Sequence, residues 1–459
     1  MTTAAGTAPA SVPAVARRAR AAVSGLFLVN AVLYANLVPR LPEVKDRLDL
    51  SNAAFGTGIA AMPVGALLAG LLAPMAIRRF GSGVVASVGL VLLSVAVLAV
   101  PFTGSWWAFV GALAVAGALD SLVDVGQNAH GFRVQRLYRR SIVNAFHGLW
   151  SIGAVLGGLM GSLAAGADVP LGLHLAVVAA VFSTMALVGM RFLLRGPEDA
   201  EREVATEAAA GSLAAAPTGP PDEAGGAATT GTNGTSCASN AVRDPSPRGR
   251  RGFGGASRAT LRLLLVLGLL AVAGAYVEDA GASWGALWLR TEVGAAAAVG
   301  GLAFVALQVA MTVGRLTGDR VTDRLGQARV ARIGGVLVTV GLGAMLAFPS
   351  VATTLVGFAL AGLGVATLIP AAMHAADELP GLPHGVGLTV VSWLLRVGFL
   401  VSPPLVGVIA DAAGLRVGLL VVVVSGVLVV LLAPALRAHG TPGAAAAAAP
   451  ATTSGSSRG

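Results

Sequence analysis

The stretch Gly314-Arg315-Leu316-Thr317-Gly318-Asp319-Arg320-Val321-Thr322-Asp323-Arg324-Leu325-Gly326 decides the fold of this chain. It is a charged, glycine-bearing loop in the sequence pattern, and it directly follows a long apolar segment. Much earlier, Arg78-Arg79-Phe80-Gly81 occupies the same place after another apolar segment. Two copies of an apolar segment followed by a basic loop predict a duplicated bundle of membrane helices.

The two copies align at a single offset of 245 residues. This shift places Arg78-Arg79-Phe80-Gly81 on Asp323-Arg324-Leu325-Gly326, and it also places Gly153 on Gly398. Because two separate landmarks share one offset, the sequence predicts an internal repeat in which each copy occupies about half of the chain.

The composition is that of a membrane protein. Of the 459 residues, 55% are hydrophobic and only 12% are charged, whereas a soluble domain averages about 25% charged residues. The net charge of +9 does not indicate nucleic-acid binding, because the arginines lie in short loops between apolar segments and form no basic face. The single cysteine, Cys237, excludes an internal disulfide framework.

A membrane-spanning helix needs about 20 mostly apolar residues. The first half offers six such segments, at about 21–39, 53–77, 82–101, 105–128, 142–166 and 170–194. The second half offers six more, at about 259–284, 294–317, 328–348, 351–373, 385–410 and 414–436. We expect no cleavage after the first segment, because no small-residue cleavage site ends it.

Five regions follow from this pattern. Residues 1–20 form an N-terminal tail, 21–195 a first six-helix bundle, and 259–437 a second one. Residues 196–258 and 438–459 are rich in Ala, Gly, Pro, Ser and Thr, a composition that cannot bury a core, so both are expected to be disordered.

Loop charges predict the orientation, because cytoplasmic loops carry an excess of Lys and Arg. One side receives the N-terminal arginines, the loops at 78–79, 133–140 and 320–332, and the basic end of the central linker. The other side receives fewer basic residues, partly offset by acids. We therefore expect both termini and the linker to be cytoplasmic, in a bacterial plasma membrane.

The segment Gly318–Gly326 resembles the signature loop of the major facilitator superfamily. The resemblance implies an all-α membrane fold of twelve helices in two pseudo-symmetric six-helix bundles, with the substrate site between them. It also implies that this loop holds helix ends together in one conformation. The residues that would form this conformational lock are Gly318, Asp319, Arg320, Asp323, Arg324, Gly326, Arg78, Arg79 and Gly81. In the first copy Arg78 stands where an acid is expected, so that half would lack the usual contact between a carboxylate and a helix end.

Further stretches look like a narrower group, the bacterial YbjJ-like permeases, which are distant relatives of the fucose permeases. They are Arg40-Leu41-Pro42-Glu43-Val44-Lys45, Asp124-Val125-Gly126-Gln127-Asn128-Ala129, Phe146-His147-Gly148-Leu149-Trp150-Ser151, Ser283-Trp284-Gly285-Ala286-Leu287-Trp288-Leu289 and Gly398-Phe399-Leu400-Val401-Ser402-Pro403-Pro404. In that group's pattern an acid is common at Ser283 and a tyrosine at Trp288. The likeness implies a permease of the sugar or organic-acid type.

Ionisable residues within the apolar segments are functional candidates, because a charge in hydrocarbon costs several kcal/mol. Asp120 and Asp124 are four residues apart and share a helix face. A buried carboxylate that gains and loses a proton would couple transport to protons, while Asp124 could instead meet a basic loop. Glu278 and Asp279 are adjacent, so we expect only one of them to face a cavity squarely. Arg396 needs a partner at its depth: Glu278, Asp120 or an anionic cargo.

Other candidates are polar or aromatic. His147 could shuttle protons or form a hydrogen bond between helices, and it shares a face with Asn144 and Trp150. Trp284 and Trp288 could line a cavity, where aromatic faces suit sugar rings, aromatic cargo or cations, or could belong to the aromatic belt at the membrane interface. Four more residues could bind hydroxyl groups or join helices: Asn30, Tyr34, Asn128 and Gln308.

The sequence predicts a secondary transporter of a small solute, with protons as the coupling ion. It contains no Gly-Lys-Ser nucleotide loop, no clustered Cys/His pattern and no Gly-x-Ser-x-Gly motif, so neither an enzyme nor a cofactor is expected. The expected partners are the solute, protons and the lipid bilayer, with no nucleic acid, and the chain is expected to be a monomer. Efflux by proton exchange is the alternative direction, and a non-transporting membrane sensor or scaffold is the alternative class.

Overall fold

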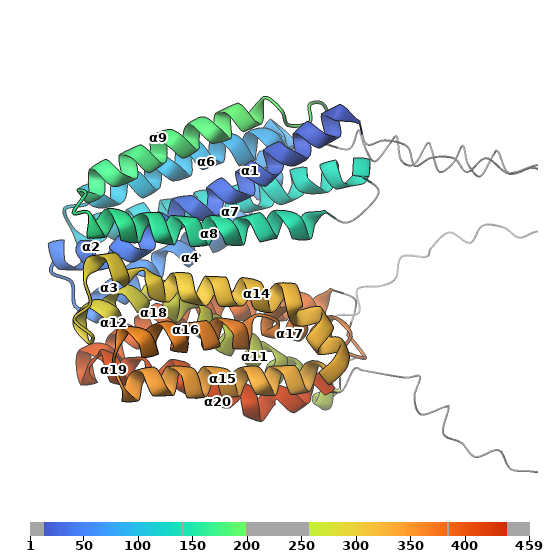
Figure 1. Ribbon diagram of the computed structural model, residues 1–459. Helices are drawn as coiled ribbons and strands as arrows, with labels where there is room; N and C mark the ends of the chain where they lie inside the picture. Colours follow the sequence, from blue (N-terminus) through green and yellow to red (C-terminus); the bar gives the residue numbers. More distant parts are fainter. Residues whose placement is uncertain (1–12, 139–141, 199–256, 383–384, 438–459) are drawn as a thin grey trace, which may run out of the picture.

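The computed structural model describes residues 13–138, 142–198, 257–382 and 385–437. Within these ranges the ordered elements are helices, and twelve helical segments are long and apolar enough to cross a membrane. Figure 1 shows two bundles of roughly parallel helices, one built from the first half of the chain and one from the second. The twelve segments agree with the twelve predicted from the sequence, and the two bundles are confirmed. The predicted region boundaries stay predictions, and most of the central linker and the C-terminal tail lie outside the described residues.

The first bundle contains nine α-helices and two short 3-10 turns, at Val38–Arg40 and Val100–Phe102. The α-helices are α1 (Ala14–Leu37), α2 (Leu41–Arg47), α3 (Asn52–Ile59), α4 (Ala61–Gly70), α5 (Ala73–Phe80), α6 (Ser82–Ala99), α7 (Trp106–Tyr138), α8 (Val143–Gly166) and α9 (Leu171–Met190).

The second bundle ends in a 3-10 turn at Ala433–Arg437. Its α-helices are α11 (Arg258–Ser283), α12 (Gly285–Thr291), α13 (Ala297–Gly300), α14 (Leu302–Leu325), α15 (Gln327–Ala347), α16 (Val351–Val365), α17 (Leu368–Asp377), α18 (Val386–Ala413), α19 (Leu415–Gly418) and α20 (Leu420–Leu432). Pro403 and Pro404 lie inside α18, which continues past them to Ala413.

The internal repeat extends to individual helix contacts. In the first bundle α1 packs on α8, α4 on α7, and α6 on both α7 and α9. In the second bundle the equivalent pairs recur: α11 with α18, α14 with α16, and α15 with α16 and α20. One close approach repeats at the same offset, since the backbone of Gly117 meets Met62 and that of Gly362 meets Leu307. The absence of a side chain at these glycines lets the paired helices touch.

The signature stretch is helical rather than a loop. Residues up to Leu325 form the last turns of α14, and only Gly326 leaves the helix, with φ 80° and ψ 148°. Gly81 ends α5 in nearly the same conformation, with φ 84° and ψ 149°. Such positive φ values favour glycine, and each glycine lets the next helix begin at once. The repeat therefore reproduces the backbone of this turn.

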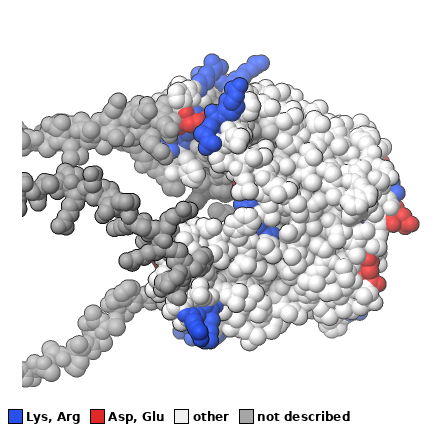
Figure 2. Space-filling view, turned by 180° about the vertical axis from the view of Figure 1, so that it is seen from behind, with Lys and Arg blue, Asp and Glu red and all other residues white. Residues whose placement is uncertain are grey.

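Charged and apolar side chains occupy different parts of the surface. The middle of the molecule is almost entirely uncharged in Figure 2, and basic side chains gather at the end on the left of that view. Large apolar side chains such as those of Leu68, Trp107 and Val340 are exposed on the outside of the helices. An apolar middle between charged ends is what a bilayer requires, so the chain is a multi-pass membrane protein.

Candidate functional site

A cavity of about 350 Å³ lies between the two bundles. Helices α1, α4, α7 and α8 form one wall, and α11, α14 and α18 form the other. Eight of the polar or aromatic residues singled out in the sequence line it: Asn30, Tyr34, Asp120, Trp150, Glu278, Asp279, Gln308 and Arg396. The repeat therefore brings together residues that are far apart in the chain.

A chain of hydrogen bonds fixes the carboxylate of the first bundle. The Trp150 indole Nε1 donates to Asn30 Oδ1 at 2.8 Å, and Asn30 Nδ2 donates to Asp120 Oδ1 at 2.7 Å. The three residues come from α8, α1 and α7, so these two hydrogen bonds join three helices at the cavity wall. The donors are neutral and orient the Asp120 carboxylate without cancelling its charge.

The carboxylate of the second bundle is held by two hydroxyl groups. Ser283 Oγ donates to Asp279 Oδ1 and Ser402 Oγ to Asp279 Oδ2, each at 2.7 Å. Glu278 also lines the cavity, which corrects the expectation that only one of the adjacent acids would do so. The wall is concave, so side chains pointing about 100° apart on α11 both reach it.

A second group of charges lies beside the cavity. Glu278 Oε2 is 3.9 Å from Arg315 Nη2, and Arg315 lies within α14 rather than in a loop. Asp124 is subject to the electrostatic effect of His147 and of Arg396, and these two residues belong to different bundles. Arg396 forms no ion pair within 4.0 Å in the described parts of the chain, so neither Glu278 nor Asp120 is its direct partner.

Other predicted residues lie outside the cavity lining. Asn128 Nδ2 donates to Asp124 Oδ1 at 2.9 Å on the same helix, and His147 packs edge-on against Phe27. Asn144 is on α8, but its side chain is outside what the structure describes. Neither Asn128 nor His147 contacts the cavity in the described conformation.

Two tryptophans of the second bundle lie neither in the cavity lining nor at the membrane interface, the two places expected for them. Trp284 and Trp288 are both fully buried, so they neither line the cavity nor form an interfacial belt. Trp284 packs edge-to-face on Phe55 of α3, and Trp288 Nε1 donates to Thr354 Oγ1 at 3.1 Å. The α11–α12 junction turns both rings inward, where Trp284 joins the second bundle to the first.

The predicted lock residues are mostly exposed. Asp319, Arg320, Asp323 and Arg324 lie on the surface of α14 and form no ion pair among the described residues. Arg78 and Arg79 are exposed on α5.

The first half has a carboxylate at the helix end after all. Glu198 Oε1 accepts from the backbone N–H of Ser82 at 2.7 Å, beside Gly81 at the start of α6. The same oxygen lies 3.2 Å from Arg133 Nη1. The acid that is missing at Arg78 is thus supplied from beyond α9, which corrects the expectation that this half lacks the contact.

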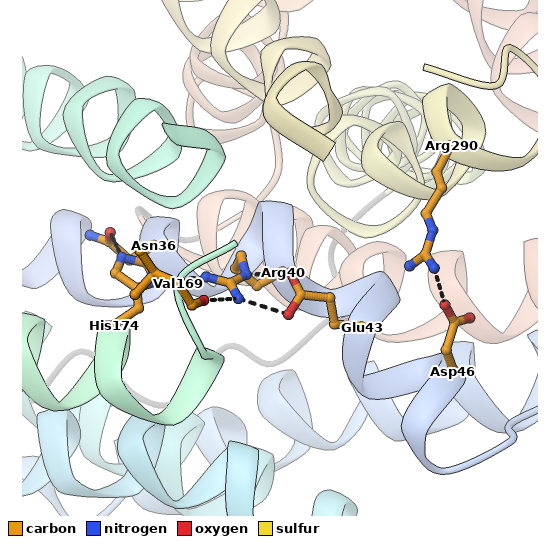
Figure 3. Close-up of polar contacts among 7 residues, drawn as sticks. All are labelled: Asn36, Arg40, Glu43, Asp46, Val169, His174 and Arg290. Atoms are coloured by element: carbon orange, nitrogen blue, oxygen red, sulfur yellow. Dashed lines mark hydrogen bonds and ion pairs between the residues drawn. The ribbon is translucent and has the colours of Figure 1, made fainter. Parts of the chain in front are cut away.

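Contacts between the bundles close one end of the cavity. Figure 3 shows Arg290 of α12 reaching Asp46 of α2, with 2.5 Å between Nη2 and Oδ2. Beside it, the buried Arg40 pairs with Glu43 and donates to the Val169 carbonyl.

The same end carries a helix cap that crosses between bundles. Asp411 accepts from the backbone N–H groups of Asn52 and Ala53, both at 2.8 Å, and so caps the N-terminus of α3 from α18. Gly56 and Gly407 allow α3 and α18 to touch there. The opposite, arginine-rich end is hollowed between the halves in Figure 2. The cavity is therefore closed at one end and open at the other.

Sequence reasoning missed four of these residues. Ser283 lies one helical turn after Asp279, a spacing that could have identified it as a partner. Ser402, Asp411 and Glu198 act over 123, more than 350 and 116 residues of chain, respectively, and no local pattern marks them.

Comparisons with known proteins agree with this architecture. The sequence model of the Major Facilitator Superfamily matches residues 264–455. The membrane protein MosC of Rhizobium meliloti is 28% identical over 410 residues, which cover 89% of this chain and 88% of that protein.

Two solved structures share the fold. The nucleoside transporter NupG superposes with a TM-score of 0.64 at 13% identity, covering 91% of this chain and 98% of that one. A D-xylose-proton symporter gives 0.61 at 14% identity, covering 92% and 96%. A duplicated twelve-helix bundle with a cavity between its halves defines a membrane transporter rather than an enzyme. The chain is a membrane transporter that is similar to the Major Facilitator Superfamily in the sequence of its second half and in its fold.

Proposed function

We propose that this transporter moves a small solute across a bacterial plasma membrane in exchange for, or together with, protons, by alternating access between its two bundles. The observation that carries the proposal is the pair Asp120 and Asp279, one carboxylate from each half, which line one cavity and are held only by neutral donors. An unpaired charge at this depth is costly, so each carboxylate favours a bound proton or a cation.

The sequence resemblance favours symport of a sugar or an organic acid. A neutral, hydroxylated solute is compatible with the polar lining of the cavity, where Asn30, Tyr34 and Gln308 offer hydrogen-bonding groups. Proton exchange is the second candidate. It is favoured by the excess of acids in the cavity lining, where Asp120, Glu278 and Asp279 face only Arg396.

The arginine-rich end is proposed to be cytoplasmic, with both termini on that side. In this orientation the contacts of Asp411 with α3 and of Arg290 with Asp46 lie at the outer end. The described conformation would then be open to the cytoplasm.

The test is solute-driven proton movement in proteoliposomes that hold the purified chain, measured with a panel of solutes. A pH change that one solute triggers in the wild type is expected to be lost in Asp120→Asn, because the amide cannot take up a proton. Glu292→Gln is the matched control, since Glu292 is exposed in the loop after α12, away from the cavity. Solute movement without proton movement in the wild type would disprove the coupling.

The same preparation separates transport from a sensor or scaffold role. Deleting residues 200–256 keeps Glu198 in place and removes most of the central linker. A transporter is expected to retain coupled solute movement in this deletion and to lose it in Asp120→Asn. The opposite pattern, in which the linker is essential to function and the cavity acids are not, would support a sensor.

A further inference from the structure

The charges of the cavity are not balanced within it. Its lining holds three acids, Asp120, Glu278 and Asp279, and one base, Arg396, and Glu278 also has Arg315 at 3.9 Å. Asp120 and Asp279 have no basic side chain within 4.0 Å in the part of the chain that the structure describes. The charged groups that act on these two are themselves acids, Asp124 on Asp120 and Glu278 on Asp279. Two carboxylates of the cavity therefore have no basic partner within 4.0 Å among the described residues.

The hydrogen bonds to these two acids orient them without neutralising them. Asp120 receives an amide N–H from Asn30, and Asp279 receives two serine hydroxyls. Tyr34 of α1 lines the same cavity as the two carboxylates. A positive group placed beside this ring would be attracted by the carboxylate of each half and by the ring face.

The rest of the lining indicates what the positive group is attached to. Apolar and aromatic residues make up most of the wall, including Phe304 and Phe399, so the body of the ligand is not highly hydrated. Gln308 is only 5% exposed, yet its amide lines the cavity and has no hydrogen-bond partner among the described residues. An amide that faces the cavity without a protein partner is free to form hydrogen bonds with a ligand group there.

The geometry points to a small organic cation as the cargo: a protonated amine on an apolar or aromatic body, with its ammonium between Asp120 and Asp279 and a hydroxyl or amide group at Gln308. This inference rests on the proposed transport function and narrows its substrate class. The cavity of about 350 Å³ limits the cargo to a compact molecule. An organic acid would meet two uncompensated carboxylates and is disfavoured.

Protons and such a cargo would compete for the same two carboxylates. Protonation removes the negative charge that holds the ammonium, so cation binding weakens as the pH falls. One half-cycle would then carry the cation and the other would carry protons. A cationic cargo therefore favours exchange over symport.

The test measures the charge preference of the cavity without knowledge of the cargo. The purified double variant Cys237→Ser, Gln308→Cys is treated with two methanethiosulfonates of similar size, one carrying a trimethylammonium group and the other a sulfonate. We expect the cationic reagent to modify the thiol introduced by Gln308→Cys at least about 10-fold faster, relative to the same rate ratio in a Cys237→Ser, Ser105→Cys control. Ser105 is exposed just before α7, outside the cavity.

The two carboxylates should account for this preference. Asp120→Asn and Asp279→Asn are each expected to lower the rate ratio by about 3-fold, because a charge-assisted contact contributes more than a neutral one. Glu292→Gln is expected to leave the ratio unchanged. A ratio equal to that of the Ser105→Cys control, or one that neither substitution alters, would overturn the inference.

Protection by ligands tests the chemical class directly. Tyramine, 4-hydroxyphenethyl alcohol and 4-hydroxyphenylacetate share one body and carry a positive, neutral and negative group, respectively. In the Gln308→Cys variant, tyramine is expected to slow modification by neutral methyl methanethiosulfonate more than the other two do, and more strongly at pH 8 than at pH 6. Stronger protection by the acid or the alcohol would overturn the inference.

The outcome is independent of the transport assay. Charge selectivity without solute-driven proton movement would retain the cation site and reject coupled transport. Coupled transport that depends on Asp120, without charge selectivity in the cavity, would retain the transporter and reject the cationic cargo.

Discussion

At the scale of single residues, the bundles depend on contacts that leave no room for a side chain. A Cβ at Gly117 would lie 1.9 Å from the Met62 carbonyl oxygen, and at Gly362 it would lie 2.2 Å from that of Leu307. These equivalent contacts join α7 to α4 and α16 to α14, and α7 and α14 are the helices that carry Asp120 and Gln308 at the cavity. The packing of small residues thus positions the polar lining.

Gly117→Ala is expected to lower stability by about 1–3 kcal/mol, because the added methyl group must push two helices apart. The measurement is the thermal unfolding midpoint of the purified protein. Gly111→Ala on the same helix is the control. Nothing lies within 4 Å of a Cβ there, so its midpoint should be unchanged or slightly higher. Equal loss in both variants would mean that the close contact does not explain the effect.

At the scale of elements, the two halves stabilise equivalent helix starts differently. The turn before α6 and the turn before α15 have the same backbone, but only the first has a carboxylate at the helix N-terminus among the described residues. That carboxylate, Glu198, also pairs with Arg133 of α7. Glu198 therefore helps to hold the first bundle together, although the sequence predicts that it belongs to the central linker.

Glu198→Gln is expected to lower stability by about 1–3 kcal/mol, since it removes the charge from bonds to a helix N-terminus and an arginine. The exposed Asp323→Asn at the equivalent turn should change the midpoint much less. A larger effect of Asp323→Asn on the thermal unfolding midpoint would mean that the turn before α15 stabilises the protein more than the turn before α6. The family resemblance implies such a role for the loop that contains Asp323.

At the scale of the whole molecule, the proposed orientation sets which end of the cavity is open to which compartment. The arginine-rich end is open and the end with the Arg290–Asp46 pair and the Asp411 cap is closed. The single cysteine makes this orientation measurable, since Cys237 lies in the central linker.

A membrane-impermeant maleimide is expected to label Cys237 only after cells are permeabilised, because the linker is predicted to be cytoplasmic. In a variant with Cys237→Ser and Ser105→Cys, the same reagent should label intact cells, since the loop before α7 is predicted to be outside. Labelling of Cys237 in intact cells would reverse the orientation and place the open end of the cavity outside.

The linear order of residues was enough to specify the fold and the polar part of the cavity lining. Twelve apolar segments and one offset of 245 residues specified two equivalent bundles, because a helix must be apolar to cross a bilayer. Polar residues inside those segments, such as Asn30, Asp120 and Gln308, stood out for the same reason, and they do line one cavity. The chemical cost of a polar group in hydrocarbon is a property of the residue and its depth, and both can be read from the sequence.

Only the tertiary structure shows which of these residues contact one another. The inward orientation of Trp284 and Trp288 depends on the junction between α11 and α12, and the partners Ser402, Asp411 and Glu198 arrive from distant parts of the chain. Helical periodicity gives the relative directions of side chains on one helix but not the rotation of that helix in its bundle. The unbalanced charges of the cavity arise from that rotation, so the preference for a cation could be inferred only after the two halves were assembled.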